Sequence, residues 1–364
     1  MEYIIRCSKC GNIEDAPSAF RCSRCDSVLE VQYTSMPKPV KTLKGALNKK
    51  RYLRFLPINS YGISLGEGNT PLIQKKFDEY PDVKILFKIE TKNPTGSFKD
   101  RGSAVEITKA LEFGFKKVVC ASTGNMGMSV AHYAKEAGLN AKIFISKDGN
   151  KNKMGRIAEY GAEIEEVNGD FNDAMLLAET EAKKTGAFVC GDYHFRKEGQ
   201  KTLMFEVIDQ LKGAPLSDMF VPVGNSTLLA ATYKALNDFF SIGLINSMPK
   251  LHGVQAEGCN PLVTAYVNEG PIKRITPNTI ADAIAVGYPT FGYEGLDGIR
   301  ATFGDADQVS DEDIKQAMKK LKEVDIGAEP GGAAAFAGFI KNYKDSPWEF
   351  SEKTVVIPVT GNND

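Results

Sequence analysis

The stretch KVVCASTGNMGMSVAHYAKEAGLNAKIFIS, residues 117–146, contains two apolar runs with a helical pattern between them. KVVCAS (117–122) and AKIFIS (141–146) predict strands, because each is short and rich in apolar residues. MGMSVAHYAKEAG (126–138) predicts a helix that ends at Gly138, a residue suited to a helix C-terminus. A strand, a helix and a second strand in this order favour a parallel sheet covered by helices.

The same alternation of strand-like and helical patterns continues from about residue 65 to the end. Further strands are predicted over 162–167, 187–192, 219–224, 251–258 and 354–360, and further helices over 151–161, 172–186, from about Gln200, over 226–239 and over 311–324. No internal repeat and no low-complexity segment interrupts the pattern. The sequence therefore predicts an α/β fold with parallel-rich sheets.

Length and composition set the broad class of the protein. The chain of 364 residues is long enough for two or three domains. With 42% hydrophobic residues, 25% charged residues and a formal net charge of −1, it lacks the basic excess of a general nucleic-acid binder. It has no apolar run long enough to span a bilayer and no signal-peptide pattern, so we expect a cytoplasmic protein without a membrane partner.

Four of the seven cysteines form two C-x2-C pairs near the N-terminus, Cys7 with Cys10 and Cys22 with Cys25. Two such pairs supply four thiolates for a tetrahedral ion, and zinc commonly occupies this ligand set. We predict a structural zinc in a small ribbon-like module of residues 1–32, because so short a module has little core of its own. The alternative is a degenerate module that has lost its metal.

Three turns that follow predicted strands are rich in small and polar residues: STGN (122–125), GNST (224–227) and TGNND (360–364). Parallel sheets bind ligands beyond the carboxyl ends of their strands, where small residues admit a ligand and helix N-termini attract anions. The backbone and hydroxyl groups of GNST suit a phosphate, and the polar side chains of STGN suit a single ligand. The GNST and STGN turns alone also fit ordinary helix starts, and in STGN Ser122 or Thr123 would be the cap.

The segment NPTGSFKDRG, residues 93–102, holds a single lysine, Lys99, beside Phe98 in a loop of small and polar residues. A lysine amine attacks an aldehyde only when it is deprotonated, and burial or neighbouring cations favour that form. Lys99 is therefore a candidate nucleophile. In isolation, however, a lysine near a turn is usually solvated.

The order of these motifs along the chain resembles one known family. NPTGSFKDRG, STGN, the GNST turn and a late strand that ends at Thr360 are similar in order to the fold type II pyridoxal 5′-phosphate enzymes, the tryptophan synthase β family. Within that family the chain looks most like the threonine synthases. Further segments that carry the resemblance are the N-terminal cysteine module, LGEGNTPLI (65–73), FRKEGQKT (195–202), GVQAEGCNP (253–261) and EPGGAA (329–334).

The resemblance implies a role for each matching residue. The implied cofactor contacts are Lys99 as covalent attachment point and proton carrier, Phe98 beside the ring, Asn125 at the phenolic oxygen, Thr360 at the pyridine nitrogen, and Gly224, Asn225, Ser226 and Thr227 at the phosphate. The implied substrate contacts are Ser122, Thr123 and Arg196. A neutral threonine hydroxyl stabilises a pyridinium less than a carboxylate does, which favours chemistry at the β and γ carbons.

The resemblance also implies an architecture, an activity and an assembly. The fold type II architecture would have two three-layer αβα domains, a large cofactor-binding domain of residues 33–98 and 196–364 and a small α/β domain of residues 99–195. Threonine synthases are lyases of threonine biosynthesis that convert O-phosphohomoserine and water into threonine and phosphate. The partner would be this small phosphorylated amino acid, and the family resemblance suggests a homodimer.

Two departures from the family pattern concern the substrate. Leu228 replaces the second asparagine of the usual phosphate loop, and Asp192 and His194 stand in an unusual run before FRKEGQKT, where their roles are unassigned. These changes leave two other enzymes open: cysteate synthase, which combines phosphoserine with sulfite, and a threonine or serine dehydratase, although dehydratases usually carry a glycine-rich phosphate loop. A non-catalytic regulator is a further alternative, but a regulator has no chemical need for Lys99.

Overall fold

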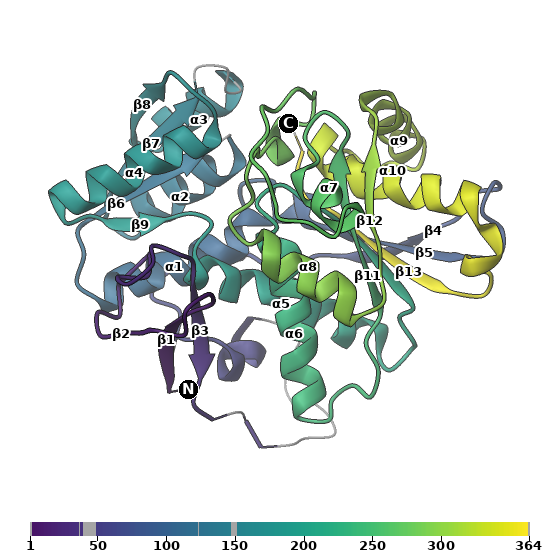
Figure 1. Cartoon of the computed structure of the whole chain (residues 1–364), viewed down its shortest axis with the longest axis horizontal. Helices are drawn as coiled ribbons and strands as arrows, with labels where there is room; N and C mark the ends of the chain where they lie inside the picture. Colours follow the sequence, from purple (N-terminus) through teal and green to yellow (C-terminus); the bar gives the residue numbers. More distant parts are fainter. Residues whose placement is uncertain (1, 36, 39–48, 123, 147–150, 363–364) are drawn as a thin grey trace. The chain divides into compact units, whose positions relative to one another are not determined.

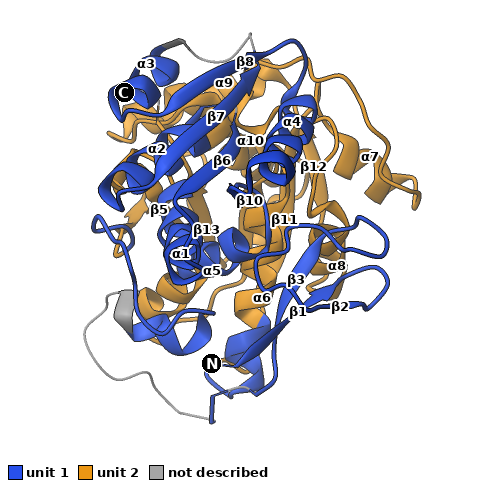
Figure 2. Ribbon diagram, turned by 90° about the vertical axis from the view of Figure 1, so that its left-hand side faces the viewer, with its two compact units in different colours: residues 1–68, 99–203, 237–244 blue, residues 69–98, 204–236, 245–364 orange. Residues whose placement is uncertain are grey.

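The computed structural model describes residues 2–35, 37–38, 49–122, 124–146 and 151–362 (Figure 1). The chain divides into two compact units: unit 1 comprises residues 1–68, 99–203 and 237–244, and unit 2 comprises residues 69–98, 204–236 and 245–364 (Figure 2). One boundary between the units falls at the peptide bond that joins Phe98 to Lys99. The bounds expected for the large and small domains stay a prediction.

Unit 1 contains a four-stranded parallel sheet in the order β8-β7-β6-β9. Its strands are β6 (Lys117–Ser122), β7 (Asn140–Ser146), β8 (Glu163–Val167) and β9 (Phe188–Cys190), and the associated helices are α1 (Lys99–Glu112), α2 (Asn125–Glu136), α3 (Lys151–Glu159) and α4 (Phe171–Thr185). The predicted parallel sheet is confirmed here, and the strands and helices predicted for this region form within a few residues of their expected bounds.

Helices cover both faces of the unit 1 sheet. The connections β6–α2–β7 and β7–α3–β8 run in one direction across the sheet, whereas α4 leads back from β8 to β9 on the other side of β6. Because parallel crossovers are right-handed, this reversal puts α4 on the opposite face from α2 and α3, as Figure 2 shows. The carboxyl ends of β6 and β9 therefore lie side by side at the reversal point, where sheets of this kind bind ligands.

Unit 2 contains a six-stranded sheet in the order β12-β11-β10-β13-β5-β4. Its strands are β4 (Leu72–Lys75), β5 (Lys84–Ile89), β10 (Asp218–Pro222), β11 (Lys250–Ala256), β12 (Ala306–Val309) and β13 (Thr354–Val359). Neighbouring strands are parallel except for the β4–β5 pair. Strands β4, β5 and β12 lie outside the predicted set, because β4 and β12 are short edge strands and Lys88 interrupts the apolar run of β5.

The remaining helices are α5 (His194–Leu211), α6 (Thr227–Ser241), α7 (Pro261–Val267), α8 (Gly292–Ala301), α9 (Asp311–Glu323) and α10 (Pro330–Asp345), with 3-10 helices at Lys49–Phe55, Glu90–Lys92, Asp282–Ile284 and Pro347–Phe350. Helix α5 begins well before the start predicted near Gln200. Its first two turns contain Arg196, Lys197 and Glu198, all of which are buried. A buried helix with charged residues has no amphipathic pattern, so its start is not visible in the sequence.

The two faces of the unit 2 sheet pack against different helices. A Cβ added to Gly253 of β11 would lie 3.0 Å from Ile299 of α8 and 3.2 Å from Leu229 of α6. The next residue, Val254, meets α10, where a Cβ added to Gly338 would lie 2.4 Å from a Val254 methyl carbon. Successive strand residues face opposite sides. Helix α10 therefore covers one face of the sheet, and α6 and α8 cover the other.

The N-terminal module is an antiparallel sheet in the order β2-β1-β3, formed by β1 (Tyr3–Cys7), β2 (Ile13–Glu14) and β3 (Leu29–Tyr33). Its two cysteine pairs occupy turns of the same form. The N–H of Gly11 donates to the Cys7 carbonyl at 3.1 Å, and the N–H of Asp26 donates to the Cys22 carbonyl at 2.9 Å. Both donor residues have left-handed backbone, with φ of 72° and 55°, which closes each turn tightly.

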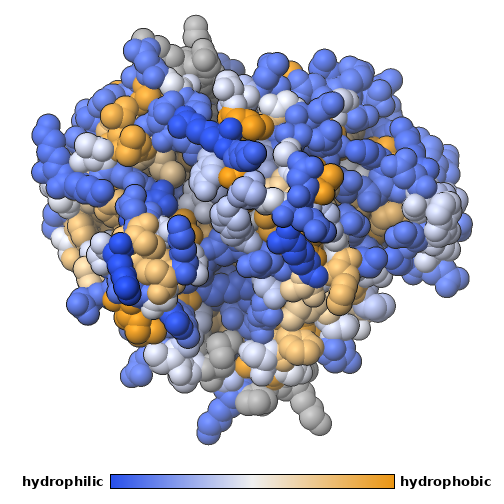
Figure 3. Space-filling view, viewed as in Figure 1, coloured by the Kyte–Doolittle hydropathy of each residue, from blue (hydrophilic) through white to orange (hydrophobic). Residues whose placement is uncertain are grey.

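Apolar side chains are concentrated in the interior of each unit. In unit 2 a core that includes Phe220, Phe336 and Ile357 lies between the sheet and α10. The face drawn in Figure 3 is largely hydrophilic, with apolar residues in small separate areas. Among the helices that the structure describes, none combines the length and the apolar character needed to cross a membrane.

Candidate active site

Lys99 is the first residue of α1, and its side chain is 15% exposed. Its Nζ atom lies 3.6 Å from Oδ1 of Asp192, whose side chain is 2% exposed. Cys120 of β6 pairs in parallel with Cys190 of β9, so Ser122 and Asp192 each follow at the same edge of the sheet. Burial lowers the pKa of Lys99, and the charge of Asp192 opposes this shift. A partly exposed amine thus lies at the edge where the sheet is expected to bind a ligand.

Arg196, near the start of α5, is bound to the first turns of α1. Its Nη1 donates to the carbonyl oxygen of Lys99 at 2.9 Å, and its Nη2 donates to Oγ of Ser103 at 2.9 Å and pairs with Glu106. The two helices are so close that a Cβ on Gly102 would lie 2.5 Å from Cγ of Arg196. Burial raises the pKa of Glu106, and the guanidinium opposes this shift. Arg196 therefore holds the backbone of Lys99, while its contact with substrate stays a prediction.

The STGN turn connects β6 to α2. The hydroxyl of Ser122 accepts hydrogen bonds from the N–H of Gly124 at 2.8 Å and of Gly127 at 2.7 Å. Ser122 thus satisfies donors at the start of α2, as the helix-start alternative expects. Asn125 is the first residue of α2 and is buried, whereas Thr123 lies outside the described residues. The predicted ligand contacts of all three polar side chains stay predictions.

In unit 2 the GNST turn connects β10 to α6, which begins at Thr227. Position 224 leaves little room for a side chain, because an added Cβ would lie 3.0 Å from Cα of Ile284. Ser226 has left-handed backbone with φ of 63°. Its Oγ atom is buried and has no hydrogen-bond partner among the described residues. A buried polar atom is rarely left unpaired, so the turn offers a hydroxyl to a ligand at the N-terminus of a helix.

Two further predicted residues of unit 2 are held by their neighbours. Oδ1 of Asn225 accepts hydrogen bonds from the N–H and from the hydroxyl of Thr290, each at 3.1 Å. The carbonyl oxygen of Thr360 accepts the N–H of Phe98 at 2.9 Å. The residue before Lys99 is therefore fixed to the end of β13, although the two segments are far apart in the sequence.

Each unit contains some of the residues that the sequence predicts for the active site. Unit 1 contains Lys99, Ser122, Asn125 and Arg196, and unit 2 contains Phe98, Gly224, Asn225, Ser226, Thr227 and Thr360. Glu106, the partner of Arg196, is not among the residues predicted from the sequence. A signal was available, because Lys99, Ser103 and Glu106 are spaced to share one face of a helix. Asp192 was noticed as a departure but was given no role.

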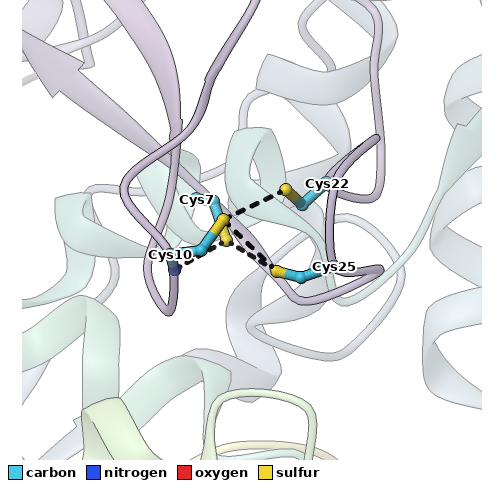
Figure 4. Close-up of side chains that lie close together, drawn as sticks. All are labelled: Cys7, Cys10, Cys22 and Cys25. Atoms are coloured by element: carbon cyan, nitrogen blue, oxygen red, sulfur yellow. Dashed lines mark hydrogen bonds between the residues drawn. The ribbon is translucent and has the colours of Figure 1, made fainter.

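The four N-terminal cysteines bring their sulfur atoms within 4.8 Å of one another (Figure 4). The Sγ atoms of Cys7 and Cys25 are 3.5 Å apart, those of Cys10 and Cys22 are 3.7 Å apart, and those of Cys10 and Cys25 are 3.4 Å apart. A tetrahedral zinc with Zn–S bonds of about 2.3 Å would separate its sulfur ligands by about 3.8 Å. The cluster therefore fits a tetrahedral metal ion.

The cysteine module also contacts the segment that carries Asp192 and Arg196. The ring of Phe20 meets the ring of Tyr193 edge to face, with centroids 6.0 Å apart. Arg21 forms an ion pair with Glu179 at 2.9 Å, and Glu179 accepts the hydroxyl of Tyr193 at 2.7 Å. The module therefore supports Tyr193, in the segment of residues 192–196, through Phe20 and, by way of Glu179, through Arg21.

Comparisons with known proteins place this site in context. Residues 63–361 match the model of the family described as "Pyridoxal-phosphate dependent enzyme". The threonine synthase of Methanosarcina acetivorans is 35% identical, with 99% of this chain and 91% of that protein covered. The threonine synthase of Methanocaldococcus jannaschii is 35% identical, with 97% of this chain and 90% of that protein covered. The solved structure of maize serine racemase matches 81% of this chain and 88% of its own with a TM-score of 0.71, at 24% identity.

Proposed function

This chain belongs to the family of pyridoxal-phosphate dependent enzymes, and we propose that it acts as a threonine synthase, converting O-phosphohomoserine and water into threonine and phosphate. The observation that carries the proposal is the 35% identity to two threonine synthases over nearly the whole chain. The family and the fold type II architecture expected from the sequence are confirmed. The protein is accordingly a pyridoxal-phosphate dependent lyase, and the cysteate synthase and dehydratase alternatives are not favoured.

We assign the attachment of the cofactor to Lys99. When bound, pyridoxal 5′-phosphate supplies an electron-withdrawing ring that stabilises negative charge on substrate carbons. The partial exposure of Lys99 supports the assignment, as does the burial that lowers its pKa, because only the neutral amine attacks an aldehyde. Phe98, Asn125 and Thr360 are assigned to the cofactor ring. The positions of these residues in the fold support the assignment. Asn125 is the first residue of α2, after β6, and Thr360 follows β13 and accepts a hydrogen bond from the backbone N–H of Phe98.

We assign the cofactor phosphate to the turn made of Gly224, Asn225, Ser226 and Thr227. The hydroxyl of Ser226, which has no partner in the part of the chain that the structure describes, supports this assignment, because a phosphate oxygen would satisfy it. The N-terminus of α6 supports it as well, since helix N-termini favour anions. Gly224 has no side chain that could cover the backbone of this turn, which leaves its N–H groups accessible to an anion.

With cofactor and substrate bound, Lys99 would be the group that moves protons to and from the substrate. Its neutral amine would take one proton from Cα and later one from Cβ of the substrate. Phosphate would leave Cγ with the bonding electron pair, water would add at Cβ, and the two protons would return to Cγ and Cα to give threonine. The hydrogen bond from Arg196 to the carbonyl oxygen of Lys99 supports this role, because it fixes the backbone from which the amine reaches the substrate. We assign the acidic groups of the substrate to Ser122, Thr123 and Arg196, and the Nε atom of Arg196, unpartnered among the described residues, supports its place in this set.

We further propose that the four-cysteine cluster binds zinc and that the protein is a homodimer. The sulfur separations of 3.4 to 3.7 Å support the metal, and four sulfur ligands make its role structural because no open position is left for catalysis. The homodimer rests on the family resemblance. Metal analysis of the purified protein tests the first proposal, and light scattering of the same sample tests the second.

The experiment that tests the function compares the purified protein with Lys99→Ala and with Lys116→Ala, a matched change at an exposed lysine. With added pyridoxal 5′-phosphate, the wild type is expected to show a visible absorbance band that borohydride bleaches. It is also expected to release equal amounts of phosphate and threonine from O-phosphohomoserine. Lys99→Ala should lose the band and the activity, and Lys116→Ala should keep both.

The same assay separates the competing enzymes. Phosphate release only from phosphoserine with sulfite would replace the proposal with cysteate synthase. Ammonia release from threonine, without phosphate release from O-phosphohomoserine, would identify a dehydratase. A colourless protein that binds no added pyridoxal 5′-phosphate would refute the assignment of Lys99.

A further inference from the structure

Asp192 lies in the bend between β9 and α5. This bend is at the carboxyl end of β9, beside β6, where the order of strand connections in the unit 1 sheet reverses. The Oδ1 atom of Asp192 is 3.6 Å from Nζ of Lys99. The backbone on either side is fixed, because the N–H of Gly191 donates to Glu106 at 3.0 Å and the N–H of Tyr193 donates to the Gly191 carbonyl at 2.6 Å. The carboxylate is thus held beside the amine by a rigid segment.

Among the described residues, three titratable or charged groups act on the amino group of Lys99: Asp192 after β9, Arg196 on α5 and Cys120 on β6. Glu106, on α1 itself, pairs with Arg196. Burial raises the pKa of Cys120, so its thiol stays neutral. The charge of Arg196 lowers the pKa of Lys99 and so favours its neutral amine. Asp192 forms an ion pair with Lys99 and acts in the opposite direction, favouring the ammonium.

Attachment of the cofactor does not explain a carboxylate at this place. A negative charge beside Lys99 opposes the loss of its proton, whereas attack on an aldehyde needs the neutral amine. The charge favours the opposite state, the ammonium that Lys99 becomes after it has taken a proton from the substrate. We propose that Asp192 is a positioning residue that stabilises and orients Lys99 as an ammonium between its proton transfers, an inference that rests on the proposed function.

The transfer of a proton from the substrate to Lys99 breaks one bond and forms one bond. The Cα–H bond of the substrate breaks, its proton forms a new N–H bond on Nζ of Lys99, and its electron pair stays on the substrate carbon. The resulting ammonium is a positive charge in a largely buried site, which is costly without a counter-charge. The carboxylate of Asp192 supplies the counter-charge and does not itself take the proton.

The test measures the amine of Lys99 in the cofactor-free protein. Wild type, Asp192→Asn, Asp192→Glu and Glu136→Gln are exposed briefly to acetic anhydride over a range of pH, and mass spectrometry measures acetylation at Lys99. Glu136 is an exposed acidic residue of α2 and serves as the matched control. We expect the pH midpoint of Lys99 acetylation to be about one unit lower in Asp192→Asn than in wild type. The midpoint of Asp192→Glu should stay close to that of wild type, and that of Glu136→Gln should not change.

Turnover of the cofactor-loaded enzyme supplies the second readout. For Asp192→Asn we expect kcat to fall about tenfold or more with KM changed by less than about threefold, because a group that assists proton transfer acts mainly on the chemical step. The acidic limb of the pH profile should move to lower pH, since the base loses its proton more readily. A carboxylate that only stabilises the fold would change neither the limb nor the labelling midpoint.

Equal labelling midpoints for wild type and Asp192→Asn would overturn the proposal, and a shifted midpoint with an unshifted pH limb would overturn its catalytic part. Labelling of Lys99 needs no turnover, so the proposed role of Asp192 can fail while the proposed function holds, and the reverse. A wild type that releases no phosphate, together with a shifted midpoint, refutes the function and leaves the effect of Asp192 on Lys99 established. If Asp192→Asn does not fold, Asp192→Ser removes the same charge with a smaller side chain and is read in the same way.

Discussion

The guanidinium of Arg196 donates a hydrogen bond to the carbonyl oxygen of Lys99 at 2.9 Å. Through Nη2 it also binds Ser103 and pairs with Glu106, so the start of α5 and the first two turns of α1 share one buried polar cluster. A buried ion pair adds little net stability but is costly to break. The placement of Lys99 therefore depends on a cluster whose other members need not touch substrate.

Arg196→Met is expected to destabilise the protein by about 3–5 kcal/mol at pH 8, because it leaves the carboxylate of Glu106 buried without its partner. Burial raises the pKa of Glu106, so this group takes up a proton more readily in the folded than in the unfolded state. Stability of the variant should therefore fall as pH rises and recover towards pH 5. Urea unfolding at both pH values measures the effect, with Arg300→Met at an exposed position as control. A loss no larger than that of the control would contradict the prediction.

Uptake of pyridoxal 5′-phosphate by the cofactor-free protein is expected to have its midpoint at a pH below 10.5, the ordinary pKa of lysine, because burial lowers the pKa of Lys99. The neutral amine is the reactive form, so the rate should rise with pH and level off once Lys99 is deprotonated. Stopped-flow absorbance measures the rate, and Nα-acetyllysine supplies the unburied amine for comparison. Identical midpoints for the protein and the free amine would show that the burial of Lys99 has no chemical effect.

Ser226→Ala is expected to weaken the binding of pyridoxal 5′-phosphate by about tenfold or more, because a hydrogen bond to a charged group contributes about 1.5–3 kcal/mol. The hydroxyl is buried and unpartnered among the described residues, so its removal breaks no bond within the protein. Thr232→Val is the matched control, since its hydroxyl on α6 is also buried and unpartnered. Fluorescence titration measures both affinities. Equal effects of the two changes would remove Ser226 from the phosphate site.

Cys22→Ser is expected to abolish metal binding, because it removes a ligand from the four-sulfur cluster. The packing of Phe20 on Tyr193 and the Arg21–Glu179 ion pair should then weaken, and hydrogen exchange should increase over residues 188–198. Metal analysis and exchange mass spectrometry measure the two effects, with Cys259→Ala as a control at a buried cysteine of unit 2. Retained metal, or unchanged hydrogen exchange over residues 188–198, would contradict the prediction that metal binding by the cysteine cluster stabilises this segment.

Gly199→Ala is expected to destabilise the protein by about 1–3 kcal/mol or more, because the new Cβ would lie 2.2 Å from the carbonyl oxygen of Arg101 and force α5 away from α1. Gly155→Ala is the matched control, since a Cβ there meets no atom within 4 Å and alanine favours a helix by about 0.5–1 kcal/mol. Thermal unfolding measures both changes. The prediction fails if the two variants shift the midpoint in the same direction.

Local patterns were enough to predict much of the fold. The strands at 117–122 and 141–146 and the helix between them form close to their expected bounds, because short apolar runs and terminal glycines act over a few residues. The start of α5 was predicted too late for the same reason. Its charged residues are buried by partners from distant segments, and no local pattern reports such partners.

By itself, the sequence determined the alternation of strands and helices, the cysteine pairs and the family to which the chain belongs, since motif order and residue spacing carry this information. The tertiary structure decided which groups meet: Asp192 beside Lys99, Glu106 with Arg196, and the Phe98 backbone on Thr360. These pairs join segments that are separate in the chain. The burial and the charge that shift the pKa of Lys99 exist only when the fold removes water and brings those segments together.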